Sequence, residues 1–516
     1  MINSNLLKKI INHNNFFGII IISIFSLAVN QYYGNLGVFP HDSFSHFETG
    51  AMIIDGFHPF KDYWVVSGPA IDYFQALIYF IFGISWKSYV LHASIINIFI
   101  SVFTFIVLRS FELNFKTSLF YSLCFSILAY PSSGTPFVDH HSAFFSLMGV
   151  YVILLSIKKD SKFISYLIPL FFILAFLSKQ VPSSYLIISI IPIYFVYIFK
   201  SKKTHLIPPL FYGSITYIFL ILLFGKLNGI SLNSFFEQYI FYPQSIASGR
   251  FENISLSILG VVGNFKFVLV SLLFLIYAGI KKVEKNHILL NKKTYLITII
   301  LVTTIVLIFH QLITRNQIFI FFLIPLIIGV ANSILNNNAF RYLLILLCLF
   351  GTIKYHERFN EERKFHELEN VDLNKALSAT LIDRKLNGLR WISPQFRENP
   401  TKEISLINEI KNYLKEDKRN KMVQGNYAFL SVILKQNLSS TTRWHVLDGT
   451  DYPLPESTYF KSYKLLVNTI IKKNNIKAIY SISPVKPENI YALIDKKCLD
   501  ELKVNQYFYR FDLKTC

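Results

Sequence analysis

Long apolar runs separated by short polar segments dominate the chain from about Phe16 to Ile353. A helix needs roughly 20 apolar residues to cross a bilayer, and the pattern predicts about eleven such helices. They start near Phe16, Trp86, Lys116, Asp139, Phe163, Pro182, His205, Gly260, Thr294, Asn316 and Phe340. Residues 354–516 instead have the polar composition of a soluble domain. The pattern therefore predicts a polytopic α-helical membrane domain over 1–353 and a C-terminal soluble domain over 354–516.

The polar segments between the apolar runs are of two kinds. One kind is short and basic, and it comprises Lys8/Lys9, Arg109/Lys116, Lys158/Lys159/Lys162, Lys200/Lys202/Lys203, residues 281–293 and Arg341. Such loops lie on the cytoplasmic side of membrane proteins. The other kind, at 31–85, 131–138, 178–180, 228–259 and 311–315, then falls outside together with the tail. We predict a multi-pass protein of the inner (cytoplasmic) membrane whose tail is extracytoplasmic.

Lys8 and Lys9 precede the first apolar run, and no small-residue cleavage site follows it. We therefore expect a retained helix rather than a signal peptide.

The first outer segment, 31–85, is too long for a simple turn and contains two helical patterns. Ser43–Asp55 forms one predicted short helix. Gly68–Gly83 begins with Pro at a first-turn position and is apolar but short for a span, which is typical of a helix lying in the membrane interface. The aromatic segment that starts at Ser231 is a second interfacial candidate.

The tail pattern is typical of a compact α/β domain. Glu403 starts a stretch with helical periodicity, and the runs KMVQGNYAFLSVIL from Lys421 and IKAIYSIS from Ile476 indicate strands. Cys498 and Cys516 can form a disulfide in an oxidising compartment, with two free thiols as the alternative.

Composition agrees with the membrane class. Of the 516 residues 53% are hydrophobic and 16% aromatic, which would leave too much apolar surface on a soluble chain. The net charge of +20 would suit nucleic-acid binding. In the membrane part, however, Lys and Arg cluster in short loops, so we read them as topology determinants and expect no nucleic-acid partner.

The outer segments collect the ionisable residues of the membrane domain: His41, Asp42, His46, Glu48, Lys61, Asp62, Asp139, His140, His141, Lys179 and Arg315. Charge close to hydrocarbon is costly and tends to line a cavity, although any one of these residues could be a solvated loop position. Arg and Lys can clamp a phosphate, and a carboxylate can take a proton from an attacking hydroxyl or amine. A sugar donor attached to a lipid phosphate requires this combination.

The run HDSFSHFETGAMIIDGFHPFKDYWVVSGPAIDYFQALIYFIFG resembles the first outer loop of GT-C glycosyltransferases, which include protein O-mannosyltransferases and aminoarabinose–lipid A transferases. In those loops an acidic residue follows the first helix, and a G-x-x-P-[FY]-x-D-x-x-x-x-x-x-P stretch precedes an interfacial helix. Asp42 fills the first position here, and Gly56, Pro59, Phe60, Asp62 and Pro69 match the second. DHHSAFFSLMGVYVILL at Asp139 and FLSKQVP at Phe176 resemble later elements of bacterial members.

The resemblance implies that Asp42 is the catalytic base and that Lys179 is a cation beside the donor phosphate. Asp139 is a second candidate catalytic carboxylate. We expect the substrate to meet Glu48, Lys61, Asp62, His140, Lys179 and Arg315. Arg315 is our own choice for a second phosphate contact, with an interfacial anchor as the alternative, whereas Asp62 is expected mainly to fix its loop. His140 and His141 would orient Asp139 or cap its helix.

The chain departs from the family pattern, because His41 precedes Asp42 and no Glu follows directly. Glu48 can supply a second carboxylate. We predict a site without metal or other cofactor; a divalent cation held by Asp42, Asp139 and His140 is the alternative.

The resemblance implies an inverting glycosyltransferase that uses a polyprenyl-phosphate-linked sugar and a lipid, glycan or protein acceptor. A lipid-linked glycan polymerase or ligase is one alternative, although those proteins usually carry their large outer loop between helices. A transporter or flippase is the other. That class would show inverted repeats and charges at mid-membrane, whereas here no repeat is seen and the charges cluster at one end.

Overall fold

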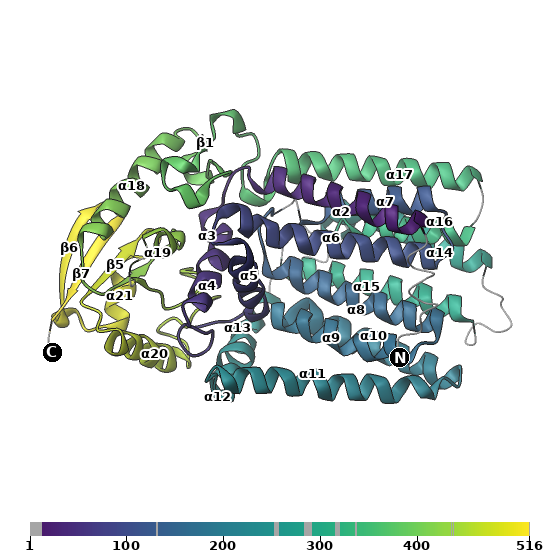
Figure 1. The fold of residues 1–516 in the computed structure, drawn as a ribbon, viewed down its shortest axis with the longest axis horizontal. Helices are drawn as coiled ribbons and strands as arrows, with labels where there is room; N and C mark the ends of the chain where they lie inside the picture. Colours follow the sequence, from purple (N-terminus) through teal and green to yellow (C-terminus); the bar gives the residue numbers. More distant parts are fainter. Residues whose placement is uncertain are drawn as a thin grey trace. The chain divides into compact units, whose positions relative to one another are not determined.

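The structure of the chain, a computed structural model, describes residues 13–130, 133–251, 257, 259–282, 291–314, 320–335, 338–434, 436 and 438–514. The chain forms two compact units (Figure 1). The first contains Met1–Gly34, Ala93–Leu222 and Asn253–Phe365. The second contains Asn35–His92, Leu223–Glu252 and His366–Cys516. The predicted division at 353/354 follows sequence order, whereas the second unit combines two of the predicted outer segments with the tail.

All eleven predicted spans correspond to helices. They are α2 (His13–Gly34), α6 (Trp86–Ser110), α7 (Phe115–Leu128), α8 (Val138–Lys159), α9 (Lys162–Ser178), α10 (Gln180–Lys200), α11 (Ile207–Leu227), α14 (Asn264–Lys282), α15 (Lys292–Thr314), α16 (Leu323–Leu335) and α17 (Asn338–His356). Within the described residues, eight helical spans are long and apolar enough to cross a membrane. The polytopic membrane class is confirmed.

Three of the eleven helices are shorter than predicted. α7 has 14 residues, α9 has 17 and α16 has 13. At α9 the reason is local, because Lys179 adopts an extended conformation with φ −162° and ψ 140°. Val181 is also non-helical, as expected for a residue before proline. By the criterion of length, eight of the eleven predicted helices can each cross a membrane with the residues that the structure describes.

Segments that we predicted to share the cytoplasmic side meet at one end of the first unit. Arg109 Nε, at the end of α6, donates to Asn15 Oδ1 near the start of α2 at 3.1 Å. Asp160, after α8, forms an ion pair with Lys203 at 2.5 Å and lies 3.0 Å from His205 Nε2, both between α10 and α11. The start of α2 therefore lies beside the end of α6, and the end of α8 lies beside the connection between α10 and α11; the sidedness inferred from the loop charges stays a prediction.

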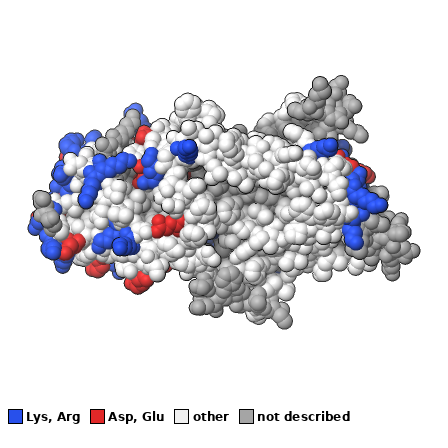
Figure 2. Space-filling model, turned by 90° about the horizontal axis from the view of Figure 1, so that it is seen from below, with Lys and Arg blue, Asp and Glu red and all other residues white. Residues whose placement is uncertain are grey.

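The helices between these loops present an uncharged surface. Figure 2 shows one face of them as a white band with Lys and Arg gathered at its end. Along α11, large apolar side chains are exposed, including Phe211, Ile215, Phe219 and Leu222. A hydrocarbon environment suits such a surface, so the chain is a multi-pass membrane protein.

The second unit contains the helices predicted in the first outer segment. These are α3 (Pro40–Ser43), α4 (Ser45–Ile54) and α5 (Pro69–Phe82). The aromatic segment from Ser231 forms α12 (Leu232–Phe235), the π-helical turn η3 (Phe236–Phe241) and α13 (Tyr242–Phe251). The last turn of α5 exposes Phe80, Ile81 and Phe82, as an interfacial helix requires.

The tail has the predicted α/β composition. Its five-stranded sheet has the order β4-β3-β5-β7-β6. The strands are β4 (Leu438–Ser439), β3 (Lys421–Gln424), β5 (Ala478–Ile482), β7 (Phe508–Leu513) and β6 (Leu499–Asn505). β3 pairs in parallel with β4 and β5, whereas β7 is antiparallel to β5 and β6. The longer helices of the tail are α18 (Pro400–Glu416), α19 (Phe429–Leu434), α20 (Phe460–Lys473) and α21 (Pro487–Leu493).

The predicted strand from Lys421 is shorter than its apolar run. It ends at Gln424, and Phe429–Leu434 is the helix α19. Gly425 explains the break, because a Cβ atom there would lie 2.6 Å from the Ile482 Cβ and 2.9 Å from the Ile482 carbonyl oxygen. Only glycine allows the backbone to approach Ile482 this closely. Beyond Gly425 the chain leaves the sheet.

The tail shares a hydrophobic core with the first outer segment. Phe44 stacks on Trp391, with 5.7 Å between ring centroids, and lies 4.5 Å from the Phe429 ring. The Trp64 amide donates to the Thr441 carbonyl at 2.9 Å. These contacts with the tail therefore hold the backbone of α3 and α4 in place, and these helices carry Asp42 and Glu48.

The cysteines fall into two groups. Cys124 and Cys348 are buried free thiols. Cys498 is disulfide-bonded, and its predicted partner Cys516 lies outside the described residues.

Candidate active site

Asp139 and Lys179 are brought together within the first unit. Asp139 is in the first turn of α8, where the helix dipole favours negative charge. Lys179 lies between α9 and α10, and its Nζ donates to both carboxylate oxygens of Asp139 at 2.8 Å. The Asp139 side chain is 5% exposed and that of Lys179 is 17% exposed. His310 Nε2, on α15, lies 3.9 Å from Asp139 Oδ1.

This arrangement gives the two residues different chemical capacities. An ammonium group has three donors, so Lys179 keeps one hydrogen for a further acceptor such as a phosphate oxygen. Asp139 uses both of its oxygens on one cation and is almost fully buried. It is therefore poorly placed to accept a proton from a substrate.

The neighbouring histidines pack against Tyr130. The His140 ring stacks on the Tyr130 ring with 5.2 Å between centroids and 22° between planes. His141 bonds to the Tyr130 hydroxyl and lies 3.1 Å from the Phe137 carbonyl through Nδ1. Both histidines are fully buried. His141 thus ties the start of α8 to Tyr130.

Asp42 lies in the one-turn helix α3, which starts at Pro40. Proline suits this first position because its φ is preset and its missing N–H would be unbonded there anyway. The Asp42 side chain is 25% exposed, and His41 Nε2 lies 4.0 Å from its Oδ1. His41 Nδ1 in turn lies 3.2 Å from Asn426 Oδ1 in the tail. Asp42 is thus a partly exposed carboxylate on a fixed backbone.

Glu48 and Asp62, also in the second unit, line one cavity of about 380 Å³. Burial raises the pKa of Glu48 to about 7, although hydrogen bonds with Ser431 and Ser440 act to lower it. Asp62 accepts from the His58 amide and from Lys473 Nζ, each at 2.9 Å. These two bonds connect Asp62 to its own loop and to the tail, and its loop-fixing role stays a prediction.

Two further predicted residues have other positions. Lys61 is exposed, and its Nζ donates to the Asn228 carbonyl at 3.2 Å. It therefore links the first outer segment to the segment that precedes α12. Arg315 lies outside the described residues.

Sequence reasoning missed a buried network around Asp72. This carboxylate accepts from His46 Nδ1 at 2.8 Å, from Thr49 Oγ1 at 2.5 Å and from the Tyr63 hydroxyl at 3.2 Å. Arg443 of the tail also donates to it. Burial acts to raise the pKa of Asp72, but the Arg443 charge and these hydrogen bonds outweigh it and hold the pKa below its usual value. An acidic residue in the first turn of the largely apolar α5 was the available signal.

The metal alternative does not fit Asp139. Its two oxygens face the Lys179 ammonium, whose charge would repel a cation. Across the described part of the chain, no group of three or more His, Cys, Asp or Glu residues is placed to hold a metal ion. A metal-free site remains our prediction.

Comparison with family models and with curated proteins finds no match. Among solved structures, the chain is similar to the Archaeoglobus fulgidus oligosaccharyltransferase in a complex with Zn and sulfate. The TM-score is 0.45 at 10% identity, over 92% of this chain and 69% of that one. Archaeal AglB from the same organism, bound to an inhibitory peptide and a dolichol-phosphate, gives 0.44 at 12% identity over 93% and 70%. ArnT from Cupriavidus metallidurans bound to undecaprenyl phosphate gives 0.42 at 10% identity over 95% and 97%. These proteins are GT-C membrane glycosyltransferases.

Proposed function

We propose that this membrane protein is a glycosyltransferase that moves a sugar from a polyprenyl-phosphate carrier to an acceptor at the outer face of the cytoplasmic membrane. An acceptor oxygen or nitrogen attacks the anomeric carbon of the donor, and the bond from that carbon to the phosphate oxygen breaks. Polyprenyl phosphate leaves, the configuration inverts, and the acceptor proton passes to Asp42.

The difference in exposure and bonding between Asp42 and Asp139 supports this proposal. Asp139 is 5% exposed and holds Lys179 through both oxygens. Asp42 is 25% exposed and follows the first spanning helix, where the sequence resembles GT-C loops. A general base must reach the proton that it removes, and Asp42 is the carboxylate that remains accessible. Its position on a short, proline-initiated helix keeps the carboxylate in place.

Lys179 serves the leaving group in this mechanism. The charge that develops on the departing phosphate is stabilised by a cation that is already in position. Asp139 acts on Lys179 rather than on the substrate, because its bidentate contact orients the ammonium group. Asp139 is thus a positioning residue.

The outer location rests on the order of charges along the chain. Basic loops meet at one end of the first unit, whereas Asp139, Lys179 and His310 meet near the ends of their helices remote from those loops. The positive-inside rule places the basic end in the cytoplasm, so the Asp139 cluster is assigned to the outer side.

Complementation of a deletion strain tests the proposal. We expect wild-type protein to restore a missing envelope glycan and Asp42→Asn to fail, since loss of a general base costs on the order of 10²–10⁴-fold in rate. Asp500→Asn, an exposed carboxylate of the tail, is the matched control and should complement fully. Immunoblots of membranes must show equal amounts of each variant. Normal glycans with Asp42→Asn would remove Asp42 as the base.

A further inference from the structure

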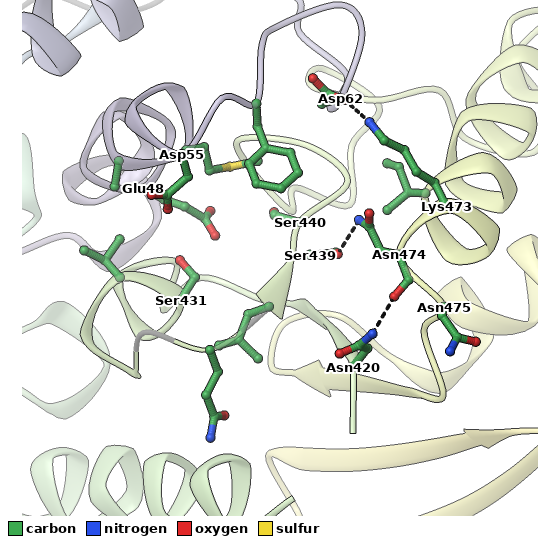
Figure 3. A pocket seen from close by; sticks show the side chains of 17 residues that line it. Glu48, Asp55, Asp62, Asn420, Ser431, Ser439, Ser440, Lys473, Asn474 and Asn475 are labelled. Carbon is green, nitrogen blue, oxygen red and sulfur yellow. Dashed lines mark hydrogen bonds and ion pairs between the residues drawn. The ribbon is translucent and has the colours of Figure 1, made fainter. Parts of the chain in front are cut away.

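A polar cavity of about 380 Å³ lies within the second unit (Figure 3). Its walls come from α4 and the following loop, from the end of α19 with β4, and from the end of α20. This volume is within the range of small-molecule sites, which runs from about 300 to 1,000 Å³. The cavity joins the first outer segment to the tail, and the mechanism above does not use it.

Uncharged hydrogen-bonding groups dominate its polar lining. The amides are those of Asn420, Gln436, Asn474 and Asn475, and the hydroxyls are those of Ser431, Ser439 and Ser440. Amides and hydroxyls both donate and accept hydrogen bonds, as a ligand rich in hydroxyl groups requires. Met52, Phe57 and Ile470 add apolar surface to the lining, which suits the C–H face of a sugar ring.

The charged groups of the lining exclude other ligand classes. Asp62 and Lys473 neutralise each other through a contact of 2.9 Å. Glu48 is 5% exposed, and burial raises its pKa to about 7, so much of it is uncharged near neutral pH. An anion would meet the Asp55 carboxylate with the Lys473 charge already held by Asp62, and the cavity lacks a clustered set of metal ligands within the described residues. The remaining class is neutral and polar.

One wall of the cavity is fixed before any ligand binds. Asn474 Nδ2 donates to Ser439 Oγ at 2.9 Å, and Asn420 Nδ2 donates to the Asn474 carbonyl at 2.8 Å. Figure 3 shows these bonds along one side of the cavity, with the Asp62–Lys473 pair above them. Pre-formed polar groups of this kind reduce the ordering cost of binding.

We propose that this cavity binds a neutral sugar residue of the acceptor, so that the acceptor class is a glycan. This inference rests on the proposed function. Glu48 is then a specificity residue: its carboxyl group, in the protonated form, can donate to one sugar oxygen and accept from another hydroxyl. Asn475, exposed at the end of α20, supplies a second contact.

Saturation-transfer NMR on the purified full-length protein in detergent tests the inference. The probes are glucose, galactose, mannose, N-acetylglucosamine and N-acetylgalactosamine. We expect at least one sugar to receive saturation, and we expect this signal to fall at least about fivefold in two variants, roughly 1 kcal/mol of binding energy. Asn475→Gly removes the amide at a residue with φ 47°, which glycine tolerates. Asp55→Trp fills the cavity from an exposed position.

Asn370→Gly is the matched control, because Asn370 is also exposed with a positive φ of 62° but does not line the cavity. Its signal should equal that of the wild type. The inference is wrong if none of the five sugars receives saturation, or if both cavity variants keep the wild-type signal. Binding is measured without transfer, so the two proposals fail separately. Sugar binding together with normal glycans in Asp42→Asn would refute only the proposed catalytic mechanism.

Discussion

Replacing Asp72 by Asn should destabilise the second unit strongly. The side chains of Asp72 and Arg443 are 0% and 1% exposed, and they form an ion pair between α5 and the tail. Asparagine keeps the shape but leaves the Arg443 guanidinium buried without its counter-charge. Breaking a buried pair from one side costs about 3–5 kcal/mol, a large share of the roughly 5–15 kcal/mol that stabilises a typical domain. The pair spans 371 positions of sequence, so its loss loosens the tail from the outer segment.

The measurement is thermal unfolding of the full-length protein in detergent, with hydrogen exchange of α5 as a local readout. About 3–5 kcal/mol corresponds to a fall in Tm of roughly 6–20 °C, at about 2–4 °C per kcal/mol for a domain of 150–250 residues. Glu398→Gln is the control. The Glu398 side chain is 80% exposed and that of its ion-pair partner Lys375 is 47% exposed, and exposed pairs of this kind contribute about 0–1 kcal/mol to stability.

A double variant separates the ion pair from the rest of the network. Asp72→Asn combined with Arg443→Met removes both charges, so we expect it to be less destabilised than the sum of the single variants by about 1–3 kcal/mol. Additive losses, or an Asp72→Asn protein within about 0.5 kcal/mol of the wild type, would contradict the assigned role of the pair.

Two further predictions concern pH and topology. Since the folded-state pKa of Glu48 is about 7, above its ordinary 4.5, the stability that the protonated group contributes is present below about pH 4.5. It is lost as the pH rises through 7. Asp451, whose pKa burial raises to about 6, acts in the same direction. The Tm should therefore fall between pH 5.5 and 8, and Glu48→Gln should flatten this fall; an unchanged slope in the variant would exclude Glu48 as its source. For topology, reporter fusions after Lys203 and Lys293 should be cytoplasmic and fusions at Gly249 and Gly449 external, because loop charge sets orientation. A cytoplasmic Gly449 fusion would overturn the proposed sidedness.

The sequence predicted those features that depend on local pattern. Apolar run length located the helices, and the positions of Asp139 and Lys179 at predicted helix ends suggested a shared site, although 40 positions separate them. Features that depend on partners distant in sequence were not visible. Nothing local connects Asp72 with Arg443, and the apolar run from Lys421 did not show that Gly425 packs against Ile482. The cavity around Glu48 likewise arises only where the tail meets α4.

The complete burial of α8 bears on how the chain enters the membrane. Its apolar stretch is wholly covered by other parts of the protein, and several of its polar side chains bond to neighbouring helices. Ser156 bonds with Ser165 of α9 and Tyr194 of α10 at 2.7 Å each, and Ser142 donates to the Lys179 carbonyl at 3.0 Å. Alone in lipid, α8 would expose these groups together with Asp139, at considerable cost. We therefore expect α8 to leave the insertion machinery only in company with α9 and α10, as one three-helix insertion unit.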